Sequence, residues 1–336
     1  MTELRSLSLH DADEATVAAW VDLRTRAAAQ DRPAGPPVCP DELRGSVLVP
    51  PPATDVIEWA AFQGDDLVGT VRLELPLEEN KDLAVLDTLV VDPASRGHGV
   101  GSALLTEAVR VARELGRTRL QGTTVGKRGA DHGSDPTGAF ARRHGATHVY
   151  TLVHNQLVVA PKPEWWDTAW QVDTSRFEVL TWGTTVPDDL VEEIAGLEAV
   201  LSGEGQSGDA DWEGRRPAVQ RVRDFERMRI SRGRRAHQMG FRDRATGQLV
   251  ARGTLSITKS WPAIGLLATA VVLPEYRRRG IGGAMAAEGI RRAVNALPEL
   301  KVVESLTVES NHKIRQLIAA LGFTEVADWV VWQLTL

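Results

Sequence analysis

The sequence predicts an α/β protein built from two domains of one design in tandem. Three observations support this prediction: a length of 336 residues, an order of expected strands and helices that occurs twice, and a glycine-rich turn that occurs once in each half. The commonest domain size is about 100–150 residues, so a chain of this length has room for two. A long-period repeat carries more weight than any single strand or helix assignment, because the same pattern is tested twice.

The first half alternates between apolar strands and helical patterns. Its expected strands are 4–9, 56–63, 67–75, 83–91, 119–125 and 148–159. A helical pattern follows Asp13, a second helix covers about 100–115, and a third begins after Asp135-Pro136, where an N-cap residue precedes a proline. Residues 33–53 are rich in proline and hold at most a short helix.

The second half repeats this order. Its expected strands are 177–182, 236–242, 248–257, 264–273, 300–308 and 324–334, and its expected helices are 187–201, 218–230, 281–295 and 311–321. Between the halves, Trp165, Trp166 and Trp170 make a linker apolar enough to dock on a domain. Residues 202–214 are rich in Gly, Asp and Ser and predict a mobile loop, whose acidic part at 203–213 is either a lid over an amine substrate or simply disordered. The expected boundaries are therefore 1–160, 161–174 and 175–336.

Composition excludes several classes of protein. A formal net charge of −6 gives no general attraction to nucleic acid or anionic membranes. Neither a signal region nor an apolar run of membrane-spanning length is apparent, so the expected location is the cytoplasm. Cys and His have no zinc spacing, and no metal is expected. The single cysteine, Cys39, lies among prolines and reads as part of a rigid loop rather than as a catalytic thiol.

A glycine-rich turn between a strand and a helix carries the chemistry. Its two copies are Arg96-Gly97-His98-Gly99-Val100-Gly101-Ser102 and Arg277-Arg278-Arg279-Gly280-Ile281-Gly282-Gly283. A helix start has unpaired backbone N–H groups and partial positive charge, so it binds anions. Glycine lets the backbone approach a diphosphate closely, and arginine adds charge-assisted hydrogen bonds. The turns therefore predict two phosphate cradles.

Other phosphate motifs fit these turns less well. The turns lack the Lys-Ser/Thr pair of a P-loop and the full spacing of a dinucleotide fingerprint. For one copy alone, an ordinary strand-to-helix connection or an unrelated phosphate-binding protein would be a fair alternative. Two copies in matching contexts favour the cradle.

Both turns resemble the diphosphate loop of the GNAT superfamily of N-acetyltransferases, written Gln/Arg-x-x-Gly-x-Gly/Ala. The second half also resembles the later motif of that family, with Asn311 before an apolar helix that ends in Leu321-Gly322-Phe323. The first half has a weaker version that ends at Gly145, with Ser134 where the asparagine would fall. The resemblance covers nearly the whole chain. It implies two domains, each a mixed, mostly antiparallel twisted sheet flanked by helices.

The resemblance further implies acetyl-coenzyme A as the acyl donor and direct attack by a primary amine of a small molecule or a peptide. In this family the strand before the turn splays from its neighbour, and the acyl-coenzyme A lies in the gap. The cofactor-binding residues carried over by this resemblance are Leu89, Val91, Arg96, Gly97, His98, Gly99, Val100, Gly101, Ser102, Ala270, Val272, Arg277, Arg278, Arg279, Gly280, Ile281, Gly282, Gly283 and Asn311.

An amine of reference pKa about 10.4 must lose a proton before it attacks, so the reaction needs a base. Asp87, on the strand that enters the first turn, and Glu309 are the candidate catalytic residues. Glu304 and His312 are weaker candidates, and the counterpart of Asp87 in the second half is Ala268.

The family often takes its acid from a tyrosine three residues before the leucine of Leu-Gly-Phe. Ile318 and Ala141 stand at that place here, so the acid is absent or comes from elsewhere. The fuller pair of motifs favours the second half for cofactor binding, whereas only the first half has an acidic residue on the key strand. A non-catalytic acyl-coenzyme A-binding or sensing protein, with one domain degenerate, is the alternative. A monomer or a homodimer is expected.

Overall fold

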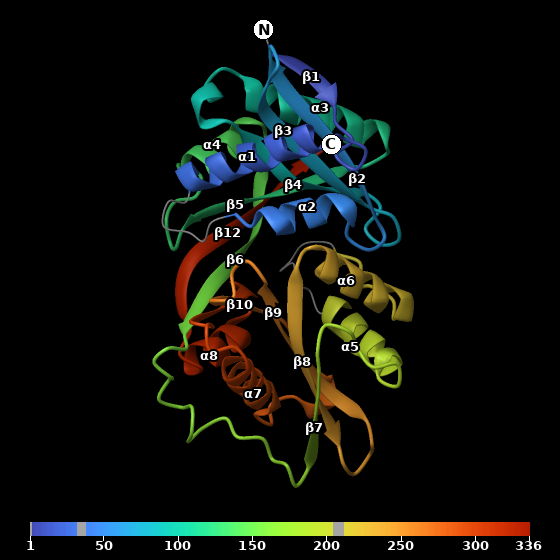
Figure 1. The fold of residues 1–336 in the computed structure, drawn as a ribbon, viewed down its shortest axis with the longest axis vertical. Coiled ribbons are helices and arrows are strands. Elements are labelled where there is room, and N and C mark those ends of the chain that lie inside the picture. The colour runs from blue at the N-terminus through green and yellow to red at the C-terminus, as the bar shows by residue number, and fades with distance from the viewer. Residues whose placement is uncertain (1, 32–37, 204–211) are drawn as a thin grey trace. The chain divides into compact units, whose positions relative to one another are not determined.

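The structure, a computed structural model, describes residues 2–31, 38–203 and 212–336 and divides into two compact units (Figure 1). Unit 1 is Met1–Thr124, Pro136–His148 and Val331–Leu336, and unit 2 is Val125–Asp135 and Val149–Val330. Each unit has a mixed sheet with helices on it, which confirms the expected fold class. The units are defined by contacts between residues, whereas the expected boundaries follow the sequence repeat. The boundaries 1–160, 161–174 and 175–336 therefore stay a prediction.

The sheet of unit 1 has the order β1-β2-β3-β4-β5. Its strands are β1 (Glu3–Ser6), β2 (Thr54–Gln63), β3 (Asp66–Pro76), β4 (Leu83–Val91) and β5 (Arg119–Lys127). The first four pair antiparallel, and β5 runs parallel to β4. A parallel neighbour needs a crossover, which the helix between β4 and β5 provides.

Helices cover both faces of this sheet: α1 (Glu14–Asp31), α2 (Pro40–Leu48), α3 (Val100–Glu114) and α4 (Pro136–Arg143). Side chains alternate along β3, so Val71 and Leu73 share one face and pack with Leu104 of α3 in the main core. Arg72 points to the other face, where it donates a hydrogen bond to the backbone carbonyl of Ser46 in α2. The sheet therefore separates an apolar side from a side that holds charge.

Capping side chains define where the helices of unit 1 begin. The Asp13 carboxylate accepts a hydrogen bond from Thr16 N at 2.8 Å. The buried Cys39 sulfur accepts one from Glu42 N at 3.4 Å, and Pro40 follows in the first turn. Cys39 thus serves as a cap in a stiff connection, in agreement with its interpretation as a structural residue.

The sheet of unit 2 has the order β6-β11-β10-β9-β8-β7. Its strands are β6 (Thr147–Val158), β7 (Phe177–Trp182), β8 (Arg234–Asp243), β9 (Leu249–Thr258), β10 (Ile264–Val272) and β11 (Val302–Val308). Only β10 and β11 pair parallel, and the other pairs are antiparallel. The unit therefore repeats the hairpin, parallel step and crossover of unit 1.

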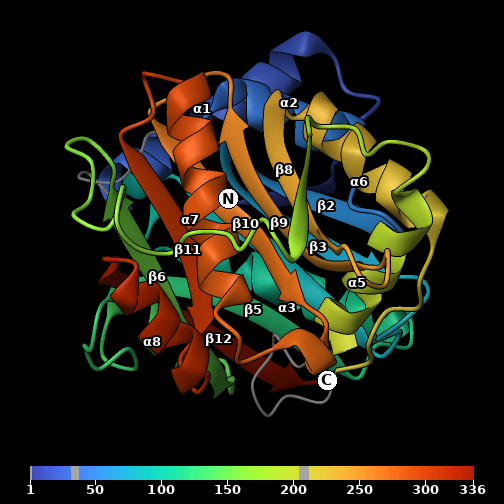
Figure 2. The same ribbon diagram turned by 90° about the horizontal axis from the view of Figure 1, so that it is seen from below.

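The helices of unit 2 are α5 (Val191–Gly203), α6 (Val219–Ser231), α7 (Ile281–Ala296) and α8 (His312–Ala320). Figure 2 looks onto the face that α7 covers, where Met285 packs with Met239 and Phe241. On the opposite face, α5 contributes Ile194 to a second apolar cluster. The helix expected from 187 begins only at Val191, because Pro187 to Leu190 form a separate turn.

The closing strands of the two halves are exchanged. β6 follows the first half in the chain, yet it pairs with β11, from Val158 opposite Val302 to Leu152 opposite Val308. The last strand, β12 (Thr324–Thr335), sends its final residues to unit 1, where Trp332 Nε1 donates to Thr124 Oγ1 at 2.9 Å. Each unit is therefore completed by chain from the other half of the sequence.

The tryptophan-rich segment after β6 packs against unit 2. Trp165 and Trp166 are buried in its core, and Trp165 Nε1 donates to the carbonyl of Leu321 at 2.7 Å. Arg291 of α7 donates to the Trp166 carbonyl at 2.8 Å. The expectation that this segment docks is confirmed. Most of the expected loop at 202–214 falls on residues 204–211, outside the described residues.

Candidate active site

The parallel strands of unit 1 pair over a short stretch and then part. β4 and β5 are in register from Leu83 with Arg119 to Leu86 with Gly122. From Thr88 to Val91, β4 is paired with β3. A strand that has lost one neighbour presents backbone N–H and C=O groups on that side. Leu89 and Val91, which were expected to meet the pantetheine arm, lie in this opened stretch.

Unit 2 opens in the same way. β10 and β11 are in register only from Ile264 with Val302 to Leu266 with Glu304. Ala270 and Val272 lie beyond, in the part of β10 that pairs with β9. Ala270 also lines a small hollow beneath α7, together with Leu267 and Met285. Both units thus have the splayed strand pair that the resemblance implies.

A β-bulge marks the point where each pair opens. The β3–β4 register shifts between Arg72 and Leu73, which leaves Asp87 as the extra residue. The β9–β10 register shifts between Leu267 and Thr269, which leaves Ala268 as the extra residue. Bulges redirect side chains and are common beside active sites. The bulge therefore presents a carboxylate in unit 1 and a methyl group in unit 2.

The two glycine turns have nearly the same backbone conformation. Gly99 has φ 84° and Gly280 has φ 77°, and each is the N-cap of the helix that follows, α3 or α7. Two residues earlier, Gly97 and Arg278 have φ 78° and 60°. An added Cβ at Gly99 or Gly280 would meet no described atom within 4 Å. These open helix starts fit a diphosphate, which would lie against the unpaired N–H groups.

The arginine that begins each turn braces the turn itself. Arg96 Nε donates to the Val91 carbonyl at 3.1 Å, and Arg277 Nε donates to the Val272 carbonyl at 2.8 Å. Arg96 also forms a two-point ion pair with Asp31 of α1, at 2.6 and 3.0 Å. In the structure these arginines therefore hold the turn in shape, and their contact with a phosphate stays a prediction.

The other turn residues differ in how they are placed. His98, Arg278 and Arg279 are exposed, whereas Val100 and Ile281 are buried at the starts of α3 and α7. The space beside Gly101 is bounded by Phe140, Val91 and Leu89, and the space beside Gly282 by Leu317 and Val272. Ser102 Oγ lies 3.0 Å from His144 Nε2, after α4. The second glycine of each motif thus faces the opened strand and the later helix.

A tryptophan from the connecting segment contacts the second turn. A Cβ added to Gly283 would lie 2.1 and 2.3 Å from two ring carbons of Trp170, and 3.0 Å from Leu317. Trp170 has φ 57°, and its carbonyl accepts a hydrogen bond from Arg291 at 3.2 Å. Residue 283 must therefore be glycine for this ring to pack, whereas unit 1 has Ser102 at the matching place.

Asp87 belongs to a charged cluster on the α1–α2 side of unit 1. Its carboxylate accepts a hydrogen bond from Thr88 Oγ1 at 3.0 Å and lies 3.6 Å from Arg72 Nε. Arg72 forms a buried ion pair with Glu58 at 2.9 Å. Burial raises the pKa of Glu58, although Arg72 and Arg24 oppose this shift. The Asp87 side chain is 39% exposed, so it is open to solvent and to a substrate.

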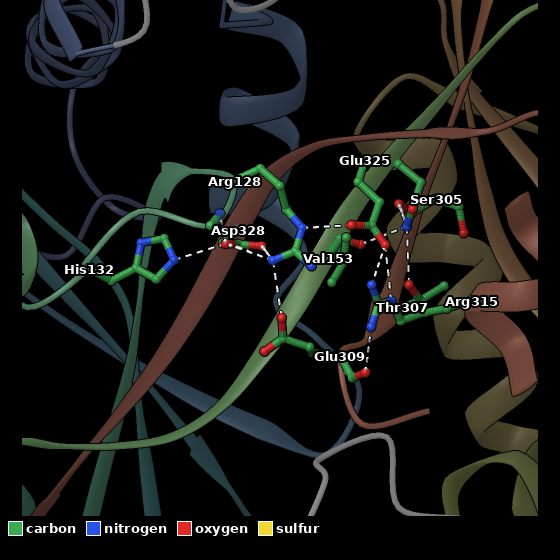
Figure 3. Close-up of polar contacts among 11 residues, drawn as sticks. Arg128, His132, Val153, Ser305, Thr307, Glu309, Arg315, Glu325 and Asp328 are labelled. Atoms are coloured by element: carbon green, nitrogen blue, oxygen red, sulfur yellow. Dashed lines mark hydrogen bonds and ion pairs between the residues drawn. The ribbon is translucent and has the colours of Figure 1, made fainter. Parts of the chain in front are cut away.

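Glu309, the other candidate base, lies in a network at the end of β11 (Figure 3). Its carboxylate is 3.1 Å from Arg128 Nη1. Arg128 also bonds to Glu325 at 2.7 Å and to the buried Asp328 at 3.0 Å. Asp328 accepts further hydrogen bonds from Gly129 N at 2.8 Å and from His132 at 2.9 Å. Glu309 is therefore one of three carboxylates that share a single arginine.

This network was not found from the sequence. Arg128 and His132 come from the end of the first half, and Glu309 and Asp328 come from the second, so no local motif links them. Glu304, the weaker candidate on β11, accepts a hydrogen bond from Gln156 at 2.9 Å, and a catalytic role for it stays a prediction.

The later motif of unit 2 is built as its sequence suggests. Asn311 caps α8, since its Oδ1 accepts a hydrogen bond from Ile314 N at 3.2 Å. Ile318, at the place of the family tyrosine, is buried in the core. Tyr276 is buried, and burial raises the pKa of Tyr150.

Comparison with known proteins decides the family. The sequence profile of the acetyltransferase (GNAT) family matches the chain twice, at residues 20–131 and 209–323. The chain belongs to this family. It is a tandem member, since each match contains one complete glycine turn and the splayed strand before it. No curated protein matches the sequence.

Solved structures agree with this assignment. A tandem GNAT protein from the clavulanic acid biosynthesis pathway, without acetyl-coenzyme A, is 30% identical, covers 100% of this chain and 98% of its own, and has a TM-score of 0.86. A GCN5-related N-acetyltransferase from Sphaerobacter thermophilus is 16% identical over 99% of this chain and 95% of its own, with a TM-score of 0.65. The second likeness shows the fold alone.

Within the described residues, no group of three or more His, Cys, Asp or Glu side chains is placed to hold a metal ion. None of the described helices combines the length and the apolar character needed to cross a membrane.

Proposed function

We propose that this GNAT protein transfers an acetyl group from acetyl-coenzyme A to a primary amine, and that unit 1 carries out the transfer. The observation that supports this proposal is the position of Asp87, at the bulge where β4 leaves β5. The open helix start at Gly99 lies eight residues beyond Val91, where the same opened stretch of β4 ends. A carboxylate, exposed backbone groups and a diphosphate cradle thus occur together on one short segment.

When bound, acetyl-coenzyme A would supply the thioester carbonyl that the amine nitrogen attacks. A C–N bond forms as the C–S bond breaks, and coenzyme A leaves as the thiol with the second proton of the attacking nitrogen. Asp87 accepts the proton that the ammonium group must lose, directly or through one water. The turn around Gly99 holds the diphosphate with its backbone N–H groups. A backbone N–H of the stretch from Thr88 to Val91 polarises the thioester carbonyl.

The test of catalysis is thiol release with acetyl-coenzyme A and a panel of amines. Asp87→Asn keeps the size of the side chain and removes the base, so we expect the rate to fall about 10²–10⁴-fold. Glu309→Gln is the matched control in unit 2, because it makes the same change from carboxylate to amide in a residue that is ion-paired with Arg128. We expect it to change the rate by about threefold or less. Equal losses in the two variants would contradict the assignment to unit 1.

Unit 2 has a second candidate role, as a unit that binds acyl-coenzyme A without transferring the acyl group. Its turn has the same backbone conformation and two exposed arginines, Arg278 and Arg279, yet Ala268 replaces the carboxylate at the bulge. If both units bind acetyl-coenzyme A tightly but no amine on the panel is acetylated, the result would favour this alternative for the whole protein.

Calorimetric titration with coenzyme A separates the two units. Gly99→Glu and Gly280→Glu place a charge and a strained Cβ in one turn each, and we expect each to weaken one binding event about tenfold or more. Gly64→Glu and Gly247→Glu are the matched controls. Both glycines have positive φ and open surroundings but lie in hairpin turns away from the splayed strands. If Gly99→Glu and Gly280→Glu bind coenzyme A as tightly as the wild type does, the diphosphate cradle is refuted.

A further inference from the structure

The charged cluster around Asp87 contains a row of side chains across three strands. Glu58 of β2 is directly opposite Arg72 of β3, and Asp87 of β4 follows at the bulge. Arg72 uses Nη1 for Glu58 at 2.9 Å, Nη2 for the Ser46 carbonyl at 3.1 Å, and Nε faces Asp87 at 3.6 Å. Every nitrogen of this guanidinium therefore already faces an oxygen, and Arg72 is committed to the fold.

Arg24 of α1 is different. It is half-buried, its guanidinium carbon lies 5.0 Å from the centre of the Trp20 ring, and Trp20 is buried. Across residues 2–31, 38–203 and 212–336, its guanidinium makes neither a hydrogen bond nor an ion pair. Burial lowers the pKa of Arg24, whereas the charges of Asp87 and Glu58 oppose this shift.

A guanidinium has five N–H donors in a planar fork that matches a carboxylate. Trp20 holds the fork over its ring by a cation–π contact and so limits the entropy lost when a ligand binds. The fork belongs to α1, which packs against β4, the strand that carries Asp87, the group that takes the ammonium proton in the proposed reaction. A ligand that reaches both groups must carry both an amine and an anion.

We propose that the acceptor is a small amino-carboxylate such as an amino acid, with its carboxylate bound by Arg24 and its amine held at Asp87. This inference rests on the proposed transfer in unit 1. It makes Arg24 a specificity-determining residue. A peptide amine has its nearest carboxylate blocked in an amide and would lose this contact.

Matched substrates test the assignment. Thiol release is measured with an amino acid, its carboxamide and the amine that lacks the carboxyl group, for several side chains at saturating acetyl-coenzyme A. For the wild-type protein we expect kcat/KM to be about 10–100-fold higher for the amino acid, which corresponds to about 1.4–2.7 kcal/mol of charge-assisted binding. Equal kcat/KM values for the three would overturn the proposal.

Arg24→Gln should reduce this preference to about twofold or less, mainly through a higher KM for the amino acid, because the carboxamide has no carboxylate contact to lose. Arg24→Lys should keep part of the preference, because a lysine retains the charge but lacks the fork. Arg113→Gln, on the exposed surface of α3, is the control for the loss of one positive charge. A similar fall in kcat/KM for all three substrates would instead show a structural role and would overturn the proposal.

The failure of this inference can be separated from the failure of the proposed function. If no amine on the panel is acetylated, the transfer itself is refuted and the inference falls with it. If amines are acetylated without regard to a carboxylate, the transfer stands and only the role of Arg24 is refuted. The dissociation constant of coenzyme A should be the same in Arg24→Gln as in the wild type, and a weaker complex would assign Arg24 to the cofactor instead.

Discussion

Replacing Gly283 by alanine tests the contact between the connecting segment and α7. The new Cβ would lie 2.1 and 2.3 Å from two carbons of the Trp170 ring. Carbon atoms in contact are normally about 3.5–4.0 Å apart, so the ring must withdraw by roughly 1.4 Å. Overpacking of this kind costs about 1–3 kcal/mol, whereas alanine in a helix is about 1 kcal/mol better than glycine. The net effect should be a loss of up to about 2 kcal/mol in the free energy of unfolding.

The free energy of unfolding is measured in urea and monitored by far-UV circular dichroism, and the same unfolding transition is compared in every variant. In a Trp170→Ala background the ring is gone, so Gly283→Ala should stabilise the protein by up to about 1 kcal/mol. The double-mutant cycle should therefore give a coupling of about 1–3 kcal/mol. Gly196→Ala is the control, because Gly196 lies in α5 with nothing within 4 Å of an added Cβ, and it should be stabilising in both backgrounds. A stabilising Gly283→Ala in the presence of Trp170 would refute the packing described here.

Three further predictions concern single side chains. Asp328→Ala should lower the free energy of unfolding by about 3–5 kcal/mol in urea unfolding, because the buried Asp328 carboxylate is the shared acceptor of the half-buried Arg128 and His132; a loss below about 1 kcal/mol would contradict this role. Burial raises the pKa of Glu325, but hydrogen bonds and charge from Arg128 and Arg315 lower it by more, so its pKa lies below the ordinary value. The stability from Glu325 is therefore present above its unfolded pKa of about 4.3 and is lost as the pH falls through its folded pKa, so Glu325→Gln should destabilise at neutral pH and match the wild type in acid unfolding. Cys39→Ser should retain full thiol release and equal or greater thermal stability, since a hydroxyl is a good N-cap acceptor; loss of activity would indicate a catalytic thiol.

The sequence alone was enough to predict the α/β class, the tandem repeat, the family and most strands. β4 and β7 begin and end where the apolar pattern places them, at Leu83–Val91 and Phe177–Trp182. The two glycine turns were also predicted, and both have the positive φ that favours glycine. These features are local, because a helix start, a cap or a left-handed residue depends on a few neighbours in the chain.

Only the tertiary structure showed the exchange of the closing strands, the bulges at Asp87 and Ala268, and the free guanidinium of Arg24. Strand pairing depends on which distant segment supplies the better edge, and alternation along β6 is equally compatible with either sheet. The network around Asp328 and the contact of Trp170 with Gly283 likewise join residues far apart in the sequence. Periodicity records which side of an element is buried, but it does not record which partner buries it, and that choice places the charges of the candidate site.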